Sequence, residues 1–236
     1  MNDAERDRME RDLDRAERAR KTKYALTVWE QGEPTVGSPA EIYLAMRGLV
    51  LPSTVEARFH PACPRERGVA PALIVLMRSI EGDTPTALQR IFLTKDYRKD
   101  GRGMMLGPTR GTAMKLIGHR ACCTGAQTWF IPRLHVCEGF ETGLALLQLG
   151  YTPTWALGSA GAIERLPELF FVGELIVMAD NDGKREHGRS GTSEGAAAAV
   201  LARWHAAGRR AAAFTVDRTG KDAADIVQQQ MQEGAL

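Results

Sequence analysis

The sequence lacks a membrane-spanning segment and a paired-cysteine motif. No apolar run among its 236 residues reaches the roughly 18 residues that a transmembrane helix requires. The first 21 residues carry too much charge for a secretory signal peptide, so we expect a cytoplasmic protein without a membrane partner. The four cysteines, Cys63, Cys122, Cys123 and Cys137, form no Cys-x-x-Cys pair. Their spacing therefore indicates neither a zinc ribbon nor a disulfide framework.

The chain also lacks a strong net charge and a Walker motif. Its formal charge is only +2, so no partner can be inferred from the total, and no Gly-x-x-x-x-Gly-Lys-Ser/Thr stretch occurs. Charge is instead concentrated locally, because residues 3–23 hold seven acidic and eight basic side chains with almost no apolar stripe. We predict that residues 1–37 form a solvated helical arm and a linker. Contact between this arm and nucleic acid is the less favoured alternative.

Residues 38–131 are predicted to form a small α+β module. Ser38 is a suitable cap for a short helix that has Pro39 at its first position and ends near Gly48. The pattern then changes to short β-like runs, which are separated by turn-rich pieces such as "EGDTP" and "DYRKDGRG". These runs favour a largely antiparallel unit.

Basic residues are concentrated in the second half of this module. Residues 95–120 contain seven Lys or Arg side chains against two aspartates. One interpretation is the solvated face of a hairpin, and the other is a patch that follows nucleic-acid phosphates. Under the second interpretation, Arg90, Arg110 and Lys115 are the residues we expect to hold template or nucleotide phosphates, because they neighbour glycine-rich turns or lie in predicted strands.

Residues 132–236 alternate between predicted strands and helices. The strands are continuous apolar runs, a pattern typical of a parallel sheet that is covered on both faces. We therefore predict an open α/β sheet. The predicted strands are "RLHVCEG", "TPTWALG", "ELIVMAD" and "RRAAAFTV".

Acidic residues follow the carboxyl ends of these predicted strands, where ligands bind in open α/β sheets. They are Glu138, Asp180, Asp182, Asp217 and Asp222. Clustered carboxylates repel one another unless a cation lies between them, and oxygen ligands suit Mg²⁺ or Mn²⁺. Residues i and i+2 of an extended segment lie on the same side, so an Asp-x-Asp pair can share one ion. Taken alone, "DNDG" also fits an ordinary turn.

The combination of motifs is more specific. "VCEGFETGLAL", followed about forty residues later by hydrophobic-Asp-x-Asp-Gly, resembles the Toprim domain of bacterial-type primases, type IA and II topoisomerases and OLD-type nucleases. Further upstream, the chain resembles primase-type Toprim proteins of phages and plasmids, in which a small N-terminal module precedes the Toprim fold. The stretches that carry this second resemblance are "EIYLAMRGL", "ARFHPACP", "ALQRIFLT" and "GRGMMLGPTRGTAMKL". The predicted fold is thus a Toprim-type open, mainly parallel sheet with helices on both faces, after a small α+β module.

The resemblance implies roles for the acidic residues. Glu138 matches the glutamate expected to act as a general acid/base or a metal ligand, and Asp180 and Asp182 match the metal-binding pair. Asp222 matches a later acidic motif that adds to the metal cluster, but its spacing departs from Asp-Pro-Asp-Glu. A helix N-cap is an equally good interpretation of Asp222.

Three further features have competing interpretations. The loop that contains Lys184 is either a phosphate-binding loop or a plain solvated loop. The turn at residues 158–162, "GSAGA", either receives a phosphate or is only a tight turn. We expect Glu141 to complement a helix dipole rather than to act as a catalyst.

The favoured function is DNA primase-like synthesis of short RNA primers on single-stranded DNA, from nucleoside triphosphates and with Mg²⁺ or Mn²⁺. Because the chain has neither a zinc ribbon nor a helicase motif, a zinc-binding module or a replicative helicase is expected to act in trans. The alternatives are a Toprim metal-dependent nuclease and a non-catalytic module that binds nucleic acid or a replication protein.

Overall fold

A mixed β-sheet forms the centre of the molecule. The computed structural model describes residues 2–116, 130–179, 193–215 and 224. In these residues nine strands form one sheet in the order β4-β3-β2-β5-β7-β6-β8-β9, and β1 pairs with β2. The strands are β1 Ala57–Pro64, β2 Val69–Ser79, β3 Pro85–Phe92, β4 Met104–Leu106, β5 Thr112–Leu116, β6 Ile131–Cys137, β7 Thr154–Ala156, β8 Val172–Ala179 and β9 Arg210–Thr215.

The first half of the sheet is antiparallel. Strand β2 pairs along its length with β1 and β3, and β4 pairs with the outer edge of β3. The last residues of β2 pair with β5 in the register Arg78 to Ala113, and β5 pairs antiparallel with β7 in the register Met114 to Ala156. The predicted antiparallel unit and the predicted parallel sheet are therefore joined edge to edge.

The second half of the sheet is parallel, as the continuous apolar runs predicted. Strand β6 lies between β7 and β8, and β9 extends the parallel sheet beyond β8. Val136 on β6 is in register with Trp155 on β7 and with Val177 on β8, and all three side chains are buried. Helices between successive strands return the chain so that these strands run in the same direction.

Helices cover both faces of the sheet, which confirms the predicted fold class. One face is covered by α2 and α3, and the other by α4, α5 and the last turns of α1. Alternate residues of β2 point to the two faces, so that Leu73 and Val75 belong to one core cluster and Ala72 and Ile74 to another. The helices are α1 Asp3–Glu30, α2 Pro39–Met46, α3 Phe140–Gln148, α4 Ala160–Glu164 and α5 Ser193–Ala206.

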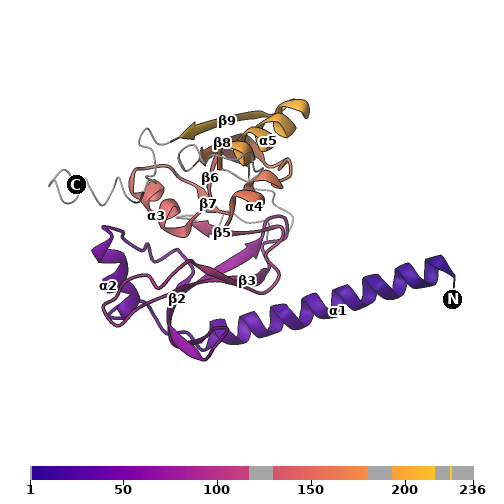
Figure 1. Cartoon of the computed structure of the whole chain (residues 1–236). Helices are drawn as coiled ribbons and strands as arrows, with labels where there is room; N and C mark the ends of the chain where they lie inside the picture. The colour runs from indigo at the N-terminus through magenta and orange to yellow at the C-terminus, as the bar shows by residue number, and fades with distance from the viewer. Residues whose placement is uncertain (1, 117–129, 180–192, 216–223, 225–236) are drawn as a thin grey trace, which may run out of the picture.

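Helix α1 lies within the predicted arm and linker, residues 1–37, but its last turns belong to the core and are not solvated. Ala25 and Val28 are fully buried against the sheet, in a cluster with Leu88 and Phe92. The preceding turns are exposed, and Figure 1 shows them projecting away from the body of the molecule. The apolar contact therefore begins only where the charged stretch ends.

Two short elements also differ from the prediction. Strand β4 was not predicted, because three residues are too few to give a periodic signal. The stretch "AIERLPELF" predicts a helix that begins at Ala162 and is broken by Pro167. Helix α4 instead begins at Ala160 and ends at Glu164, two residues earlier at each end. A proline disfavours helical backbone at the residue before it, which explains the early end. The sequence also predicts a closing helix, "DAADIVQQQMQ", of which only Ala224 is among the described residues.

No helix in the described part of the chain is both long enough and apolar enough to cross a bilayer.

Candidate metal centre and nucleotide pocket

The carboxyl ends of β6 and β8 lie side by side. The two strands are parallel neighbours, and the register pairs His135 with Ile176 and Val136 with Val177. Glu138 follows the last residue of β6, while Ala179, the last residue of β8, immediately precedes Asp180 in the sequence. Glu138 and the end of β8 are therefore at the same edge of the sheet.

The other predicted ligands lie outside the described residues. These are Asp180, Asp182 and Asp222, and the predicted phosphate-binding residue Lys184 lies outside them as well. Among the residues that are described, no group of three or more His, Cys, Asp or Glu side chains is arranged to hold a metal ion. The set of carboxylate ligands consequently stays a prediction. Of its proposed members, only Glu138 is among the described residues.

Backbone hydrogen bonds connect Glu138 to the turn between β7 and α4. The Gly158 N–H donates to the Glu138 carbonyl oxygen at 2.8 Å, and the Leu157 N–H donates to the Cys137 carbonyl oxygen at 2.9 Å. Gly158 has a φ of +87°, and a Cβ built there would be 2.5 Å from the Met105 methyl group on β4. The positive φ favours glycine at this position, where the antiparallel half approaches the turn next to Glu138.

A cavity of about 660 Å³ opens beside this turn. Its walls come from both halves of the sheet, because β4, β5 and the turn before β5 face α4 and the segment after it. Its charged lining residues are Arg110, Arg165, Arg203 and Glu168. Three cations and one anion make the cavity positively charged, which suits a ligand that carries phosphates.

The three arginines differ in how they are held. Arg203 donates hydrogen bonds to the carbonyl oxygens of Glu164 and Leu166 at 2.7 and 2.9 Å, so it fixes the end of α4. Arg110 and Arg165 are exposed. Arg110 was predicted from the sequence, and the structure brings it to the cavity. Arg165 was missed, although it lies only three residues after the "GSAGA" turn.

The turn at residues 158–162 begins with a conventional cap. The Ser159 side chain accepts a hydrogen bond from the Ala162 N–H at 3.2 Å. Ser159 also lines the cavity, but α4 has only five residues. The segment is therefore a capped tight turn that also lines the cavity, so neither interpretation excludes the other. The arginines are the stronger anion-binding feature of the cavity wall.

Arg90 lies inside the antiparallel half. The side chain is almost fully buried, and its guanidinium donates to the carbonyl oxygens of Pro64 at 2.5 Å and Met105 at 3.0 Å. It also lies over the Phe92 ring at 5.5 Å. These contacts connect β1, β3 and β4, and the phosphate contact predicted for Arg90 stays a prediction.

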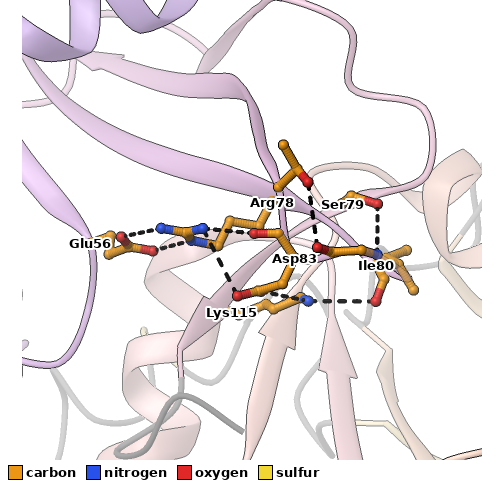
Figure 2. A network of polar contacts seen from close by, with 8 residues as sticks. Glu56, Arg78, Ser79, Ile80, Asp83 and Lys115 are labelled. Atoms are coloured by element: carbon orange, nitrogen blue, oxygen red, sulfur yellow. Dashed lines mark hydrogen bonds and ion pairs between the residues drawn. The ribbon is translucent and has the colours of Figure 1, made fainter. Parts of the chain in front are cut away.

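Lys115 belongs to a polar network between the two halves (Figure 2). Its Nζ is 2.9 Å from Asp83 Oδ1 and lies over the Trp155 ring at 4.8 Å. Arg78 donates to the Asp83 carbonyl oxygen at 2.7 Å and forms a two-pronged ion pair with Glu56 at 2.6 and 2.7 Å. The Lys115 side chain is only 9% exposed. Its described contacts are therefore structural, and its predicted phosphate contact stays a prediction.

In the sequence, His60 and Cys63 are two potential metal ligands without further partners, which favours a structural role. Both are buried on β1. The His60 Nδ1 accepts a hydrogen bond from the Ala62 N–H at 3.2 Å, and burial lowers the pKa of its imidazole. Burial raises the pKa of the Cys63 thiol to about 11. A thiol with this pKa is protonated at neutral pH, so it is a poor metal ligand and a poor nucleophile.

Comparison with known families identifies the parallel half. Residues 133–233 match a family model described as the Toprim domain. The chain carries a Toprim domain. Residues 19–116 match a second model, described as a domain of unknown function (DUF7146). No curated protein sequence matches the chain.

Solved primase structures share the fold across most of the chain. The E. coli primase catalytic core has a TM-score of 0.56 at 16% identity, and the match covers 90% of this chain and 76% of that one. A DNA primase domain from Pseudomonas aeruginosa has a TM-score of 0.53 at 15% identity, with 89% and 74% covered. The DnaG primase catalytic domain bound to single-stranded DNA has a TM-score of 0.52 at 14% identity, with 93% and 81% covered. These likenesses show a primase-like fold that spans both halves.

Glu138 lies at the strand-to-helix junction of the Toprim domain, between β6 and α3. Helix α3 begins at Phe140, and its N-cap residue, Gly139, offers no side chain to cap the helix. Glu141, in the first turn, is buried and contacts residues of the DUF7146 region. The expectation that it serves chiefly the helix dipole overlooked these contacts, because their partners are distant in sequence.

Proposed function

We propose that this chain is a metal-dependent nucleotidyltransferase that synthesises short RNA primers on single-stranded DNA from nucleoside triphosphates. The observation that carries this proposal is the parallel pairing of β6 with β8, which brings Glu138 to the edge from which the Asp180 segment departs. A likeness of fold to primase catalytic domains across most of the chain supports the same reaction class.

The proposed metal ligands are Glu138, Asp180 and Asp182, with Asp222 as a further ligand. Toprim domains generally bind divalent ions, and a set of carboxylates fits Mg²⁺ or Mn²⁺, which prefer oxygen ligands. A bound ion supplies charge neutralisation at the phosphate and lowers the pKa of an attacking hydroxyl. Glu138 is proposed either to ligate the ion or to accept the proton from that hydroxyl.

The cavity beside the Gly158 turn is proposed to hold the phosphates of a nucleotide or of the template. Arg110 and Arg165 enter it from opposite halves, and their guanidinium groups suit phosphate oxygens. Lys184 is proposed to add a further contact from its loop. The internal contacts of Arg90 and Lys115 favour a role in holding the cavity wall in place.

The proposed partners are a single-stranded DNA template and, in trans, a replicative helicase or a zinc-binding module. One structurally similar protein is a DnaG catalytic domain bound to single-stranded DNA, which supports the choice of template. The chain offers no Cys-x-x-Cys ribbon and no Walker motif of its own. Template selection and unwinding are therefore assigned to other proteins.

Incubation with single-stranded DNA, labelled nucleoside triphosphates and Mn²⁺ tests the proposal. The wild type should yield short labelled oligonucleotides, and Asp180→Ala should yield none. Asp100→Asn is a matched control, because Asp100 is a half-exposed aspartate that pairs with Arg65. An equal yield from Asp180→Ala and wild type would refute the proposed metal site. Nicking of DNA without nucleotides would indicate a nuclease, and metal-independent DNA binding without any product would indicate a binding module.

A further inference from the structure

The start of α3 is held from outside its own helix. Its N-cap residue, Gly139, makes no side-chain cap hydrogen bond to the first turn. Capping side chains stabilise a helix start by about 1 kcal/mol, so an uncapped first turn frays easily. Glu138 directly precedes this cap, which makes its position sensitive to any fraying of α3.

Glu141 in that first turn is tied to the DUF7146 region by three side chains. Its carboxylate accepts hydrogen bonds from the Tyr43 hydroxyl and the Lys99 ammonium, and Arg47 Nη1 lies 3.7 Å from Oε1. The Glu141 side chain is 9% exposed. A carboxylate buried to this degree is stable only when it is paired and hydrogen-bonded, so the three partners are essential to its placement.

The far end of α3 is tied to the same region. The Gln148 amide donates to the Gly48 carbonyl oxygen at 3.0 Å and accepts from the Val50 N–H at 2.8 Å. Residues 141 and 148 are two helical turns apart and lie on one side of α3. Between them, Leu144 belongs to the core cluster that also contains Leu44. Helix α3 is thus bound to the DUF7146 region at both ends, and only the tie at Glu141 is adjacent to Glu138.

From these contacts we infer that Glu141 is a positioning residue. The DUF7146 region, through Tyr43, Arg47 and Lys99, holds the first turn of α3 in place and thereby fixes the backbone on which Glu138 is carried. A carboxylate at the sheet edge must be placed within a fraction of an ångström to act on a reacting group or an ion. The antiparallel half would then contribute to the chemistry without touching the reacting atoms. This inference rests on the proposed role of Glu138 for its functional consequence.

Amide hydrogen exchange tests the structural part without any activity. Two amides report on the backbone at residues 138 and 139, since the Gly158 N–H donates to the Glu138 carbonyl and the Gly143 N–H to the Gly139 carbonyl. Glu141→Gln should accelerate exchange at these two amides by about tenfold, because local opening becomes easier. Gln148→Ala is the matched control at the other end of α3, and it should change them less than about twofold.

Lys99→Met provides a second variant in case Glu141→Gln does not fold, because the Lys99 side chain is one-third exposed. Lys95→Met is its control, since Lys95 is an exposed lysine of the same segment. Equal exchange in Glu141→Gln and Gln148→Ala, or in Lys99→Met and Lys95→Met, would overturn the inference.

Mn²⁺ binding, followed by electron paramagnetic resonance, tests the functional part. Glu141→Gln should weaken Mn²⁺ binding by about tenfold, a loss typical for residues that orient a metal ligand. Gln148→Ala should leave the affinity unchanged even where its melting temperature falls equally. If the wild type binds no Mn²⁺, the proposed metal site is wrong, and the exchange data alone decide whether the tie holds the start of α3. Faster exchange with unchanged Mn²⁺ affinity would overturn the positioning role.

Discussion

The antiparallel and parallel halves of the sheet use charged residues differently. In the antiparallel half, Arg78, Asp83 and Lys115 contact one another or backbone carbonyl groups (Figure 2). In the parallel half, Glu138 and the residues that follow β8 occur directly after strand ends. Neighbouring antiparallel strands end at opposite edges, whereas parallel strands all end at the same edge. Strand direction, more than local charge, thus determines where a sequence gathers carboxylates.

The largest expected effect is the loss of chemistry at the parallel edge. Glu138→Gln should lower primer synthesis by about 10³-fold, the scale of a lost acid/base group or metal ligand, with little change in the unfolding free energy. Glu56→Gln in the antiparallel half should instead lower the unfolding free energy and leave primer synthesis nearly unchanged, because Glu56 pairs with Arg78. Initial rates and urea unfolding of both variants check this. Full activity in Glu138→Gln would contradict the assignment of the chemistry to the parallel half.

The next effect is on stability in the antiparallel half. Asp83→Asn should lower the unfolding free energy by about 3 kcal/mol, because it leaves the buried Lys115 ammonium without its counter-charge. Asparagine tolerates the φ of +54° at this position, so backbone strain is not the cause. Asp100→Asn, which breaks the more exposed pair with Arg65, should cost less than about 1 kcal/mol. Urea unfolding measures both, and equal losses would show that burial does not govern these pairs.

The sequence was sufficient to predict the parallel half, because each strand is one apolar run and the acidic residues are local to the strand ends. It was insufficient for the junction between the halves. That junction depends on the pairing of Arg78 with Ala113 and of Met114 with Ala156, which no local pattern specifies. The end of β2 has no periodicity that distinguishes β5 from another partner.

Side-chain partners were harder to predict than strands. Arg90 and Lys115 occur in a basic region, and only their distant neighbours Met105 and Asp83 reveal that they are internal. Arg165 was missed for the opposite reason, since its cavity forms only when the turn before β5 faces α4. Predicting the location of Glu138 required only one strand and the turn after it, whereas predicting the pocket required the complete fold.

A smaller effect concerns pH and compares one histidine from each half. Burial lowers the pKa of His60 on β1 and of His135 on β6 below the usual value of 6.5. As the pH falls through 6.5, the unfolded chain binds protons that these folded imidazoles resist, so the stability present at neutral pH is progressively lost.

Urea unfolding between pH 7.5 and pH 5.5 measures this loss. His60→Gln and His135→Gln should each reduce the pH dependence, and the remaining part should belong to the histidine in the other half. A pH dependence that neither substitution changes would assign it to other groups.

The smallest effect is expected at α1, which packs against β1 and β3 of the antiparallel half. Its first turns are exposed over residues 2–21, while Ala25 and Val28 are buried against the sheet. A chain that begins at residue 19 should therefore unfold within about 0.5 kcal/mol of the full chain. Val28→Ala should cost about 1.5 kcal/mol, because it removes two buried methyl groups. If the truncation lowers the unfolding free energy more than Val28→Ala does, the arm stabilises the fold through contacts beyond those of its last two turns. The antiparallel half would then extend further along α1 than its buried residues indicate.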